Sequence, residues 1–386
     1  MGIYTEYLTK QLDFQALQAE RKAQLKAISA LRKGRDVLVY ASDMMKQAPS
    51  SIDYSDQLPF HDQLTTLAGR ELDIILETPG GIGEVVEDIV RVIRGRYDHV
   101  GIIIPGTAKS AGTIFAMAAD EILMGVTSSL GPIDAQIINN SKRFSADAFL
   151  DGLTKIKEEV LKTGKLNPAY IPILQNISPG EIQHCENAQN FSKTLVKEWL
   201  AKYKFKYWET HSSTGKPVTE DEKKQKADQI AERLCKHGDW LTHGRSIKID
   251  DLTQMGLRIT DYDKEPALQD AINRYYTLLR LTFEGTNIFK VYETIGSQVY
   301  RFVGGAVPPP APQPQQIQAA NFDFPCPKCK TPFKIQANLA PGVPMGEGMT
   351  PYPANDIFVC PVCNTQSNLS QARLQIEAQS GKKVVQ

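Results

Sequence analysis

The sequence predicts an α/β fold built on a parallel β-sheet, followed by a small cysteine-rich domain at its carboxyl end. Short apolar runs typical of strands alternate with stretches of helical periodicity, which is the pattern of βαβ units. The runs at 74–76 (IIL) and 102–104 (III) are apolar at every position, as expected for strands buried on both faces. Two C-x-x-C pairs, at 326–329 and 360–363, mark the second domain.

The predicted elements follow one another along the chain as helix, strand, strand, helix, strand, helix and strand. Strands are predicted at 36–40, 72–76, 99–104 and 122–124, and helices at 5–33, 85–93, 110–119, 145–203 and 265–283. The polar, lysine-rich segment 209–226 is predicted to be a loop that leads into a further helix. Residues 304–320 are rich in Pro, Gln and Ala and form a predicted linker.

Composition and charge limit the class of protein. The 386 residues are 41% apolar and 23% charged, and their formal net charge is zero, so we expect no general attraction to nucleic acid or to anionic membranes. No apolar run approaches the ~18 residues that would span a bilayer. The first residues have no basic-then-apolar signal pattern. We therefore expect a cytoplasmic protein that is not bound to membranes.

Ser110 is the candidate nucleophile because it lies between a buried strand and an apolar helix. A serine at the first turn of a helix is surrounded by unpaired N–H groups and by the positive end of the helix dipole. The small neighbours Ala108, Ala111 and Gly112 allow a sharp turn and a close approach of a substrate carbonyl. A purely structural role for Ser110, as the cap of this helix, is the simpler alternative.

The turn at Gly80 and Gly81 ends another predicted strand. Because the carboxyl ends of parallel strands meet at one edge of a sheet, we expect this turn to lie beside Ser110. The N–H groups of Gly80 and Gly81, with that of Ala111, would then form an oxyanion hole.

Four motifs in fixed order resemble the ClpP/crotonase superfamily. They are TPGG at 78–81, AKSAGT at 108–113, ADEILMG at 119–125 and SLGPIDAQ at 129–136. Within the superfamily they are most similar to the serine dehydrogenase proteinase family, a relative of SppA, over about 34–300. The resemblance implies a spiral of βαβ units, hydrolysis of polypeptide substrates and assembly into a homo-oligomer. It also implies that Ser110 is the nucleophile and that Gly81 and Ala111 are the oxyanion donors.

The general base is less evident. In the families that the sequence resembles, ClpP-like enzymes use a Ser-His-Asp triad and SppA-like enzymes a Ser-Lys dyad. No histidine lies between Ser110 and His184, and Asp134 occupies the region where a triad histidine is expected. A Ser-Lys dyad is therefore predicted, with Lys142 as the first candidate for a desolvated base.

Four other residues are further candidates for the base. Lys155 and Lys157 are the alternatives to Lys142. Lys109 is disfavoured because side chains of adjacent residues diverge. His243 is either a distal base or a hydrogen-bonded structural histidine, and the structural role is preferred.

The two C-x-x-C pairs predict a structural Zn(II) site formed by Cys326, Cys329, Cys360 and Cys363. Each pair bends tightly enough to direct both sulfur atoms to one ion, and four thiolates close a tetrahedral site. We expect this zinc ribbon not to fold without its metal, and it is a possible surface for a protein partner. Its lysines are too few to predict nucleic-acid binding. The basic and aromatic stretch 202–208 is interpreted as a helix end with snorkelling lysines.

These features divide the chain into an N-terminal helix (1–34), a protease domain (35–303), the linker (304–320) and the zinc ribbon (321–386). Two alternative functions remain at this point. One is a catalytically degenerate oligomeric scaffold that presents the ribbon, and the other is a crotonase-like acyl-CoA enzyme with the same oxyanion hole.

Overall fold

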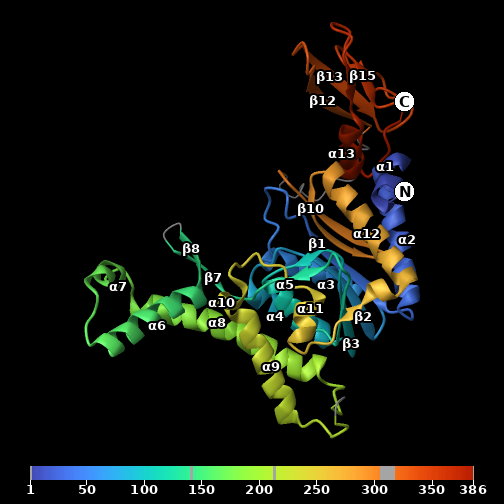
Figure 1. Cartoon of the computed structure of the whole chain (residues 1–386). Helices are drawn as coiled ribbons and strands as arrows, with labels where there is room; N and C mark the ends of the chain where they lie inside the picture. Colours follow the sequence, from blue (N-terminus) through green and yellow to red (C-terminus); the bar gives the residue numbers. More distant parts are fainter. Residues whose placement is uncertain (1, 140–141, 212–213, 305–317, 386) are drawn as a thin grey trace. The chain divides into compact units, whose positions relative to one another are not determined.

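The apolar runs of the sequence form neighbouring parallel strands of one β-sheet (Figure 1). A computed structural model of the chain describes residues 2–139, 142–211, 214–304 and 318–385. Strands β1, β2, β3 and β5 run parallel to one another, with Val39 beside Ile75 and Ile75 beside Ile103. All three side chains are fully buried, and so are Leu38, Ile74 and Ile102 on the opposite face, so both faces of the sheet are covered. The predicted α/β class with a parallel sheet is confirmed.

The described residues form two units. The larger comprises Ile28–Asp270 and Lys290–Val299, and the smaller comprises Met1–Ala27, Ala271–Phe289 and Tyr300–Gln386. Most of the predicted linker, 305–317, lies outside the described residues. The four-part division drawn from the sequence stays a prediction.

The main sheet has the strand order β11-β10-β1-β2-β3-β5-β9. Its strands are β1 (Asp36–Ser42), β2 (Glu71–Glu77), β3 (His99–Ile104), β5 (Glu121–Met124), β9 (Thr260–Asp261), β10 (Ile288–Thr294) and β11 (Gln298–Phe302). Two separate two-stranded sheets are formed by β4 (Thr107–Ala108) with β6 (Ser129–Leu130), and by β7 (Gln136–Asn139) with β8 (Lys142–Ser145). The helices of the larger unit are α3 (Gln57–Thr65), α4 (Gly83–Arg94), α5 (Ala111–Met117), α6 (Ala146–Thr163), α7 (Ile171–Leu174), α8 (Pro179–Trp199), α9 (Glu220–Cys235), α10 (His237–Trp240) and α11 (Ile249–Gln254).

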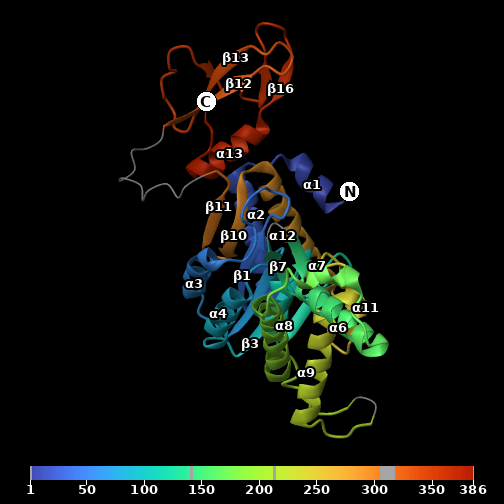
Figure 2. The same ribbon diagram turned by 90° about the vertical axis from the view of Figure 1, so that its left-hand side faces the viewer.

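The predicted long helix 145–203 is interrupted. Helix α6 ends at Gly164, which adopts a left-handed conformation (φ 70°) typical of a helix end. Helix α8 begins anew at Ser178, whose side chain accepts a hydrogen bond from the Glu181 N–H, while the Glu181 carboxylate accepts one from the Ser178 N–H. Helices α8 and α9 lie side by side (Figure 2).

The predicted helix 5–33 is two helices, α1 (Ile3–Lys10) and α2 (Phe14–Leu31). Gln11 has a φ of 45° and ends the first helix. The Asp13 carboxylate accepts a hydrogen bond of 2.7 Å from the Ala16 N–H, which satisfies an otherwise unpaired donor at the start of the second.

The smaller unit also contains the cysteine-rich segment. The smaller unit is formed by α1, most of α2, most of α12 (Pro266–Gly285), β12 (Ala319–Pro325), β13 (Pro332–Asn338), β14 (Thr350–Pro351), β15 (Ile357–Val359), β16 (Gln366–Asn368) and α13 (Ser370–Ser380). The ring of Phe358 lies 5.4 Å from that of Phe324 and 5.1 Å from that of Phe333. These rings give the segment a small aromatic core beside its cysteines. Among the described residues, no helix is both long and apolar enough to cross a membrane.

Strand β10 was not predicted because its sequence, IFKVYET, contains two charged residues. It runs antiparallel to β1, with Lys290 beside Ser42 and Tyr292 beside Tyr40, and every one of its residues is buried. A charge can be buried in this way only when it is paired and hydrogen-bonded.

The partner of Lys290 is Asp56, and both side chains are almost completely buried. The Lys290 Nζ donates to both carboxylate oxygens of Asp56, at 2.7 and 2.9 Å, and to the Ser51 carbonyl at 2.7 Å. The hydroxyl groups of Tyr40 and Tyr292 donate to the same carboxylate. This network joins the antiparallel strand to the segment that precedes α3.

We expect Asp56→Asn to lower the free energy of unfolding by about 3–5 kcal/mol, because the buried Lys290 ammonium then keeps only the more distant Asp53 carboxylate, at 3.7 Å, as a counter-charge. Denaturant titration at neutral pH measures the change. Asp98→Asn is the matched control, since Asp98 forms a two-bonded pair with Arg70 in which both side chains are about two-thirds exposed. That substitution should cost about 1 kcal/mol or less. Equal effects of the two substitutions would contradict the importance of the buried pair.

Candidate functional site

Ser110 lies at a sharp turn between β4 and helix α5. Its backbone has φ 50° and ψ −117°, a conformation that side-chain-bearing residues rarely adopt. The side chain is half-buried, and within the described residues its Oγ forms no hydrogen bond with the protein. Strained backbone of this kind costs about 1–3 kcal/mol and is concentrated at functional sites.

The Gly80–Gly81 turn, which follows β2, lies against Ser110. A Cβ atom on Gly80 would come within 2.7 Å of the Ser110 Cβ and 2.6 Å of the Lys109 carbonyl oxygen, so only glycine fits there. The two turns are held in register by hydrogen bonds from the Thr78 N–H to the Thr107 carbonyl and from the Lys109 N–H to the Thr78 carbonyl. The carboxyl ends of β2 and β3 thus meet at the serine.

The backbone around Gly81 leaves its N–H available. Ile52 donates to the Gly80 carbonyl at 2.7 Å and accepts from the Ile82 N–H at 2.9 Å, which uses the groups on either side of Gly81. In the part of the chain that the structure describes, no protein acceptor occupies the N–H of Gly81 or that of Ala111, the first residue of α5. Both glycines have positive φ, 99° for Gly80 and 150° for Gly81.

Lys109 is directed away from the reacting position. Its Nζ donates to the Leu130 carbonyl at 2.9 Å, and to the Arg245 carbonyl and the Ser246 Oγ at 3.1 Å each. Burial, together with the positive charge of Lys248, lowers the pKa of Lys109 to about 8. Lys109 therefore ties the nucleophile turn to the loop around residue 245.

A buried carboxylate in the segment between β6 and β7 binds two histidines. Asp134 is completely buried and accepts hydrogen bonds from the Nδ1 of His243 at 2.6 Å and from the Nδ1 of His237 at 2.8 Å. Burial on its own would raise the pKa of Asp134, but the hydrogen bonds from His243 and His237 outweigh it and hold the pKa below its usual value. Because the carboxylate accepts from Nδ1, the Nε2 atom of each ring is left as the possible proton acceptor.

This cluster belongs to the same part of the molecule as the nucleophile turn. Strand β6 pairs with β4 just before Ser110, and Leu130 of β6 exchanges backbone hydrogen bonds with Ile247. Lys109 holds the carbonyl of Arg245, which is two residues from His243. Asp134 and His243 stand out separately in the sequence, but His237 and the pairing were not predicted, because about a hundred residues separate the partners.

The three lysines predicted as candidates for the general base lie on β8 and on helix α6. Lys142 is the first residue of β8, where its backbone pairs with Asn139, and its side chain lies outside the described part of the structure. Lys155 is on α6, 72% exposed, and forms an ion pair of 2.6 Å with Asp151. That hydrogen bond raises the pKa of Lys155, which favours the protonated form. Lys157, on the same helix, is also exposed. Neither helix residue is desolvated as a lysine base must be.

The four predicted cysteines converge. Their Sγ atoms all lie within 4.8 Å of one another, with Cys326 3.6 Å from Cys363 and Cys329 3.6 Å from Cys360. Four sulfurs at about 2.3 Å from one tetrahedral ion would be about 3.8 Å apart, so the donor set fits such an ion.

The two C-x-x-C turns have the same backbone structure. The Lys330 N–H donates to the Cys326 carbonyl and the Asn364 N–H to the Cys360 carbonyl, each at 2.9 Å. Lys330 and Asn364 both have positive φ, 62° and 55°. Four cysteines arranged in this way can bind a metal ion.

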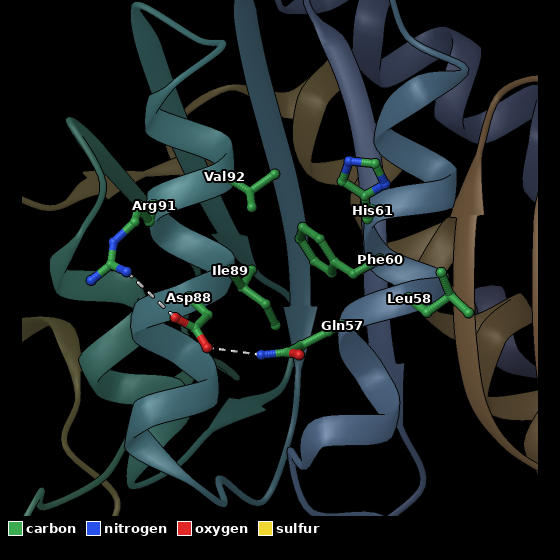
Figure 3. Close-up of a pocket in the computed structure, with 8 residues that line it drawn as sticks. All are labelled: Gln57, Leu58, Phe60, His61, Asp88, Ile89, Arg91 and Val92. Atoms are coloured by element: carbon green, nitrogen blue, oxygen red, sulfur yellow. Dashed lines mark hydrogen bonds and ion pairs between the residues drawn. The ribbon is translucent and has the colours of Figure 1, made fainter.

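A separate groove of about 480 Å³ lies between α3 and α4 (Figure 3). Its floor includes Phe60 and Ile89, and its rim carries a 2.9 Å hydrogen bond from Gln57 to Asp88. None of the predicted site residues lines it, so this groove is distinct from the candidate site at Ser110.

Comparison with known proteins supports the family resemblance. Residues 51–216 match the model of the ClpP-like SDH-type serine proteinase family, and all four sequence motifs lie within this segment. The resemblance drawn from the sequence is thus confirmed. Two uncharacterised proteins of Methanocaldococcus jannaschii are similar: one is 28% identical over 188 residues (49% of this chain, 51% of the relative), the other 26% over 195 residues (49% and 54%). The chain spans about half the length of the curated relatives it matches.

A solved structure of a membrane-bound stomatin-specific protease, carrying a serine-to-alanine mutation, also matches. The TM-score is 0.33 and the sequence identity 16%, with 56% of this chain and 77% of that chain covered.

Proposed function

We propose that the chain is a serine peptidase that cleaves peptide bonds through an acyl-enzyme on Ser110. The observation that carries the proposal is the strained backbone of Ser110 packed directly against Gly80. A helix cap needs no positive φ, since capping residues ordinarily have extended backbone. The match of residues 51–216 to a serine proteinase family supports the same assignment.

The oxyanion hole is assigned to the N–H groups of Gly81 and Ala111. When Ser110 Oγ attacks the carbonyl carbon of the scissile peptide, the carbonyl oxygen becomes negatively charged. Two fixed N–H donors stabilise that charge without reorganisation, and loss of one such donor costs about 10²–10³ in rate. Support comes from the availability of both N–H groups on the two turns that meet at the serine.

Two residues compete for the role of general base. His243 is favoured by the structure because a buried carboxylate fixes its Nδ1 as a donor and leaves Nε2 to take the Ser110 proton. The same proton would then pass to the amine leaving group, and water would hydrolyse the acyl-enzyme. In this scheme Asp134 is a positioning residue, since it acts through the histidine. Lys142 remains the alternative from the sequence.

The cysteine-rich segment is proposed to bind one structural Zn(II) through Cys326, Cys329, Cys360 and Cys363. Four protein ligands leave no open position for a substrate, so the ion would stabilise the fold and take no part in hydrolysis. The ribbon would then be available to bind a protein partner. Polypeptide substrates, assembly into a homo-oligomer and a cytoplasmic location are further parts of the proposal, and they rest on the family resemblance and on the composition of the chain.

Ser110→Ala should reduce hydrolysis of fluorescently labelled, unfolded casein by at least about 10³-fold, because it removes the attacking oxygen. The same variant should no longer react with a fluorophosphonate probe. Ser178→Ala, at the exposed start of α8, is the control and should retain both activities. Full activity of the Ser110 variant would refute the assignment. A wild-type chain that neither labels nor hydrolyses casein would favour a scaffold or a crotonase-like enzyme.

His243→Ala is expected to lower the casein hydrolysis rate by about 10²–10⁴-fold, since the serine loses its proton acceptor. Asp134→Asn should also lower kcat with little effect on KM, because the ring is then held in the wrong tautomer. The exposed His184, on α8, provides the matched control, and His184→Ala should be fully active. If Lys142→Ala is inactive while His243→Ala keeps its activity, the base is the lysine.

One zinc ion per chain is expected by elemental analysis of protein purified without chelator. Cys363→Ser should weaken metal retention. Removal of the metal should make the ribbon sensitive to protease, because the free energy of metal binding then no longer stabilises its fold. Cys185→Ala is the control, as Cys185 is a buried residue of α8 and is not one of the four converging cysteines. A ribbon that stays protease-resistant in the metal-free protein would contradict the structural role.

A further inference from the structure

A cavity of about 900 Å³ opens at the amino ends of β3 and β5 in the larger unit. It lies at the opposite edge of the parallel sheet from Ser110, since His99 and Glu121 are the first residues of these strands. The six residues of β3 span about 20 Å between the two edges. Cavities of this size accommodate ligands as large as ordinary cofactors.

Three cations line the cavity without an ion-pair partner among the described residues: Lys204, Lys226 and Arg258. The Lys204 Nζ has one protein contact there, a 3.3 Å hydrogen bond to the Asp120 carbonyl oxygen, although an ammonium can donate three. Burial lowers the pKa of Lys204 to about 8, although the negative charges of Glu121 and Asp120 offset part of this effect. Lys204 therefore has two donors available for an anion.

The acidic residues of the cavity do not neutralise these cations. The Asp120 carboxylate is 2.6 Å from the Arg94 guanidinium, and Glu121 is paired with Arg32 and Arg35. Arg94, Arg32 and Arg35 do not line the cavity. Arg32 and Arg35 also pair with Asp73 and Glu71, so Asp120 is compensated and Glu121 is compensated in part. The third carboxylate of the cavity, Glu209, is exposed. The lining thus has an excess of positive charge.

Aromatic side chains line the same cavity: Phe205, Tyr207 and Trp208. The Trp208 ring lies 5.6 Å from that of Phe205. All three belong to the basic and aromatic stretch 202–208, whose lysines the sequence analysis interpreted as snorkelling. In the structure the stretch is divided, because Lys202 lies over the ring of Tyr203 while Lys204 and the three aromatic residues face the cavity.

We propose that this cavity binds a nucleotide. The phosphate groups would contact Lys204, Lys226 and Arg258, because Lys and Arg are the side chains that bind phosphate most strongly. The base would pack on Trp208 or Tyr207, whose faces are suited to a planar ring. A bare phosphate would use only the cations and an uncharged aromatic molecule only the rings, whereas a nucleotide uses both. This site is independent of the peptidase activity proposed for Ser110.

Isothermal titration of the full chain with ATP, GTP and UTP in magnesium-free buffer tests the proposal. We expect saturable one-to-one binding of at least one of them, with the nucleoside and inorganic pyrophosphate each at least about tenfold weaker. Arg258→Gln and Lys204→Met should each weaken binding about tenfold or more, as expected for the loss of a charged hydrogen bond. Arg258 is exposed, so its substitution should leave the fold intact.

Lys202→Met is the matched control, because Lys202 is an exposed lysine of the same stretch that does not line the cavity. It should bind as the parent chain does. The Ser110→Ala variant should also bind normally, which separates this site from the peptidase. Absence of saturable binding for all three nucleotides would overturn the proposal. So would equal affinity for pyrophosphate, or binding unchanged in both cavity variants.

Discussion

The candidate site depends on the close contact between two turns, one that carries Gly80 and Gly81 and one that carries Ser110. Gly80 comes so near to Ser110 that no side chain fits between them, and Ser110 in turn adopts a backbone conformation that an isolated peptide would avoid. The contact exists because β2 and β3 are parallel neighbours whose carboxyl ends meet. The pairing of these strands therefore positions the serine and also maintains its strained backbone conformation.

Two buried carboxylates of the larger unit are compensated by residues far away in the sequence. Asp56 is paired with Lys290, and Asp134 binds His243. Such pairs add little to stability compared with apolar packing, but breaking one is costly because the remaining charge stays buried. They consequently fix which distant segments meet. Lys204 differs from these carboxylates, since it has no ion-pair partner among the described residues and faces a cavity where a ligand can provide an anion.

Local signals allowed the sequence to predict the parallel strands, the turn at Ser110 and the convergence of the four cysteines. The breaks in the long predicted helices were also visible locally, in Gly164 and in the capping pattern that begins at Ser178. Strand β10 and the histidine cluster were not predictable in the same way. From the sequence alone Lys290 would be expected to be exposed, because nothing nearby in the sequence indicates its pairing with Asp56. Likewise, no residue near His243 in the sequence indicates its hydrogen bond with Asp134. Partners separated by one to two hundred residues leave no trace in hydrophobic periodicity.

The position of β10 has a consequence for where this fold can be cut. The family match ends at residue 216, yet β1 is covered on one side by a strand from residues 288–294. A fragment that stopped at 216 would lose that strand and turn β1 into a sheet edge with unpaired backbone groups. Its residues Val37, Leu38 and Val39 are completely buried in the intact chain. An edge this apolar is a template for pairing with other chains, so such a fragment would aggregate.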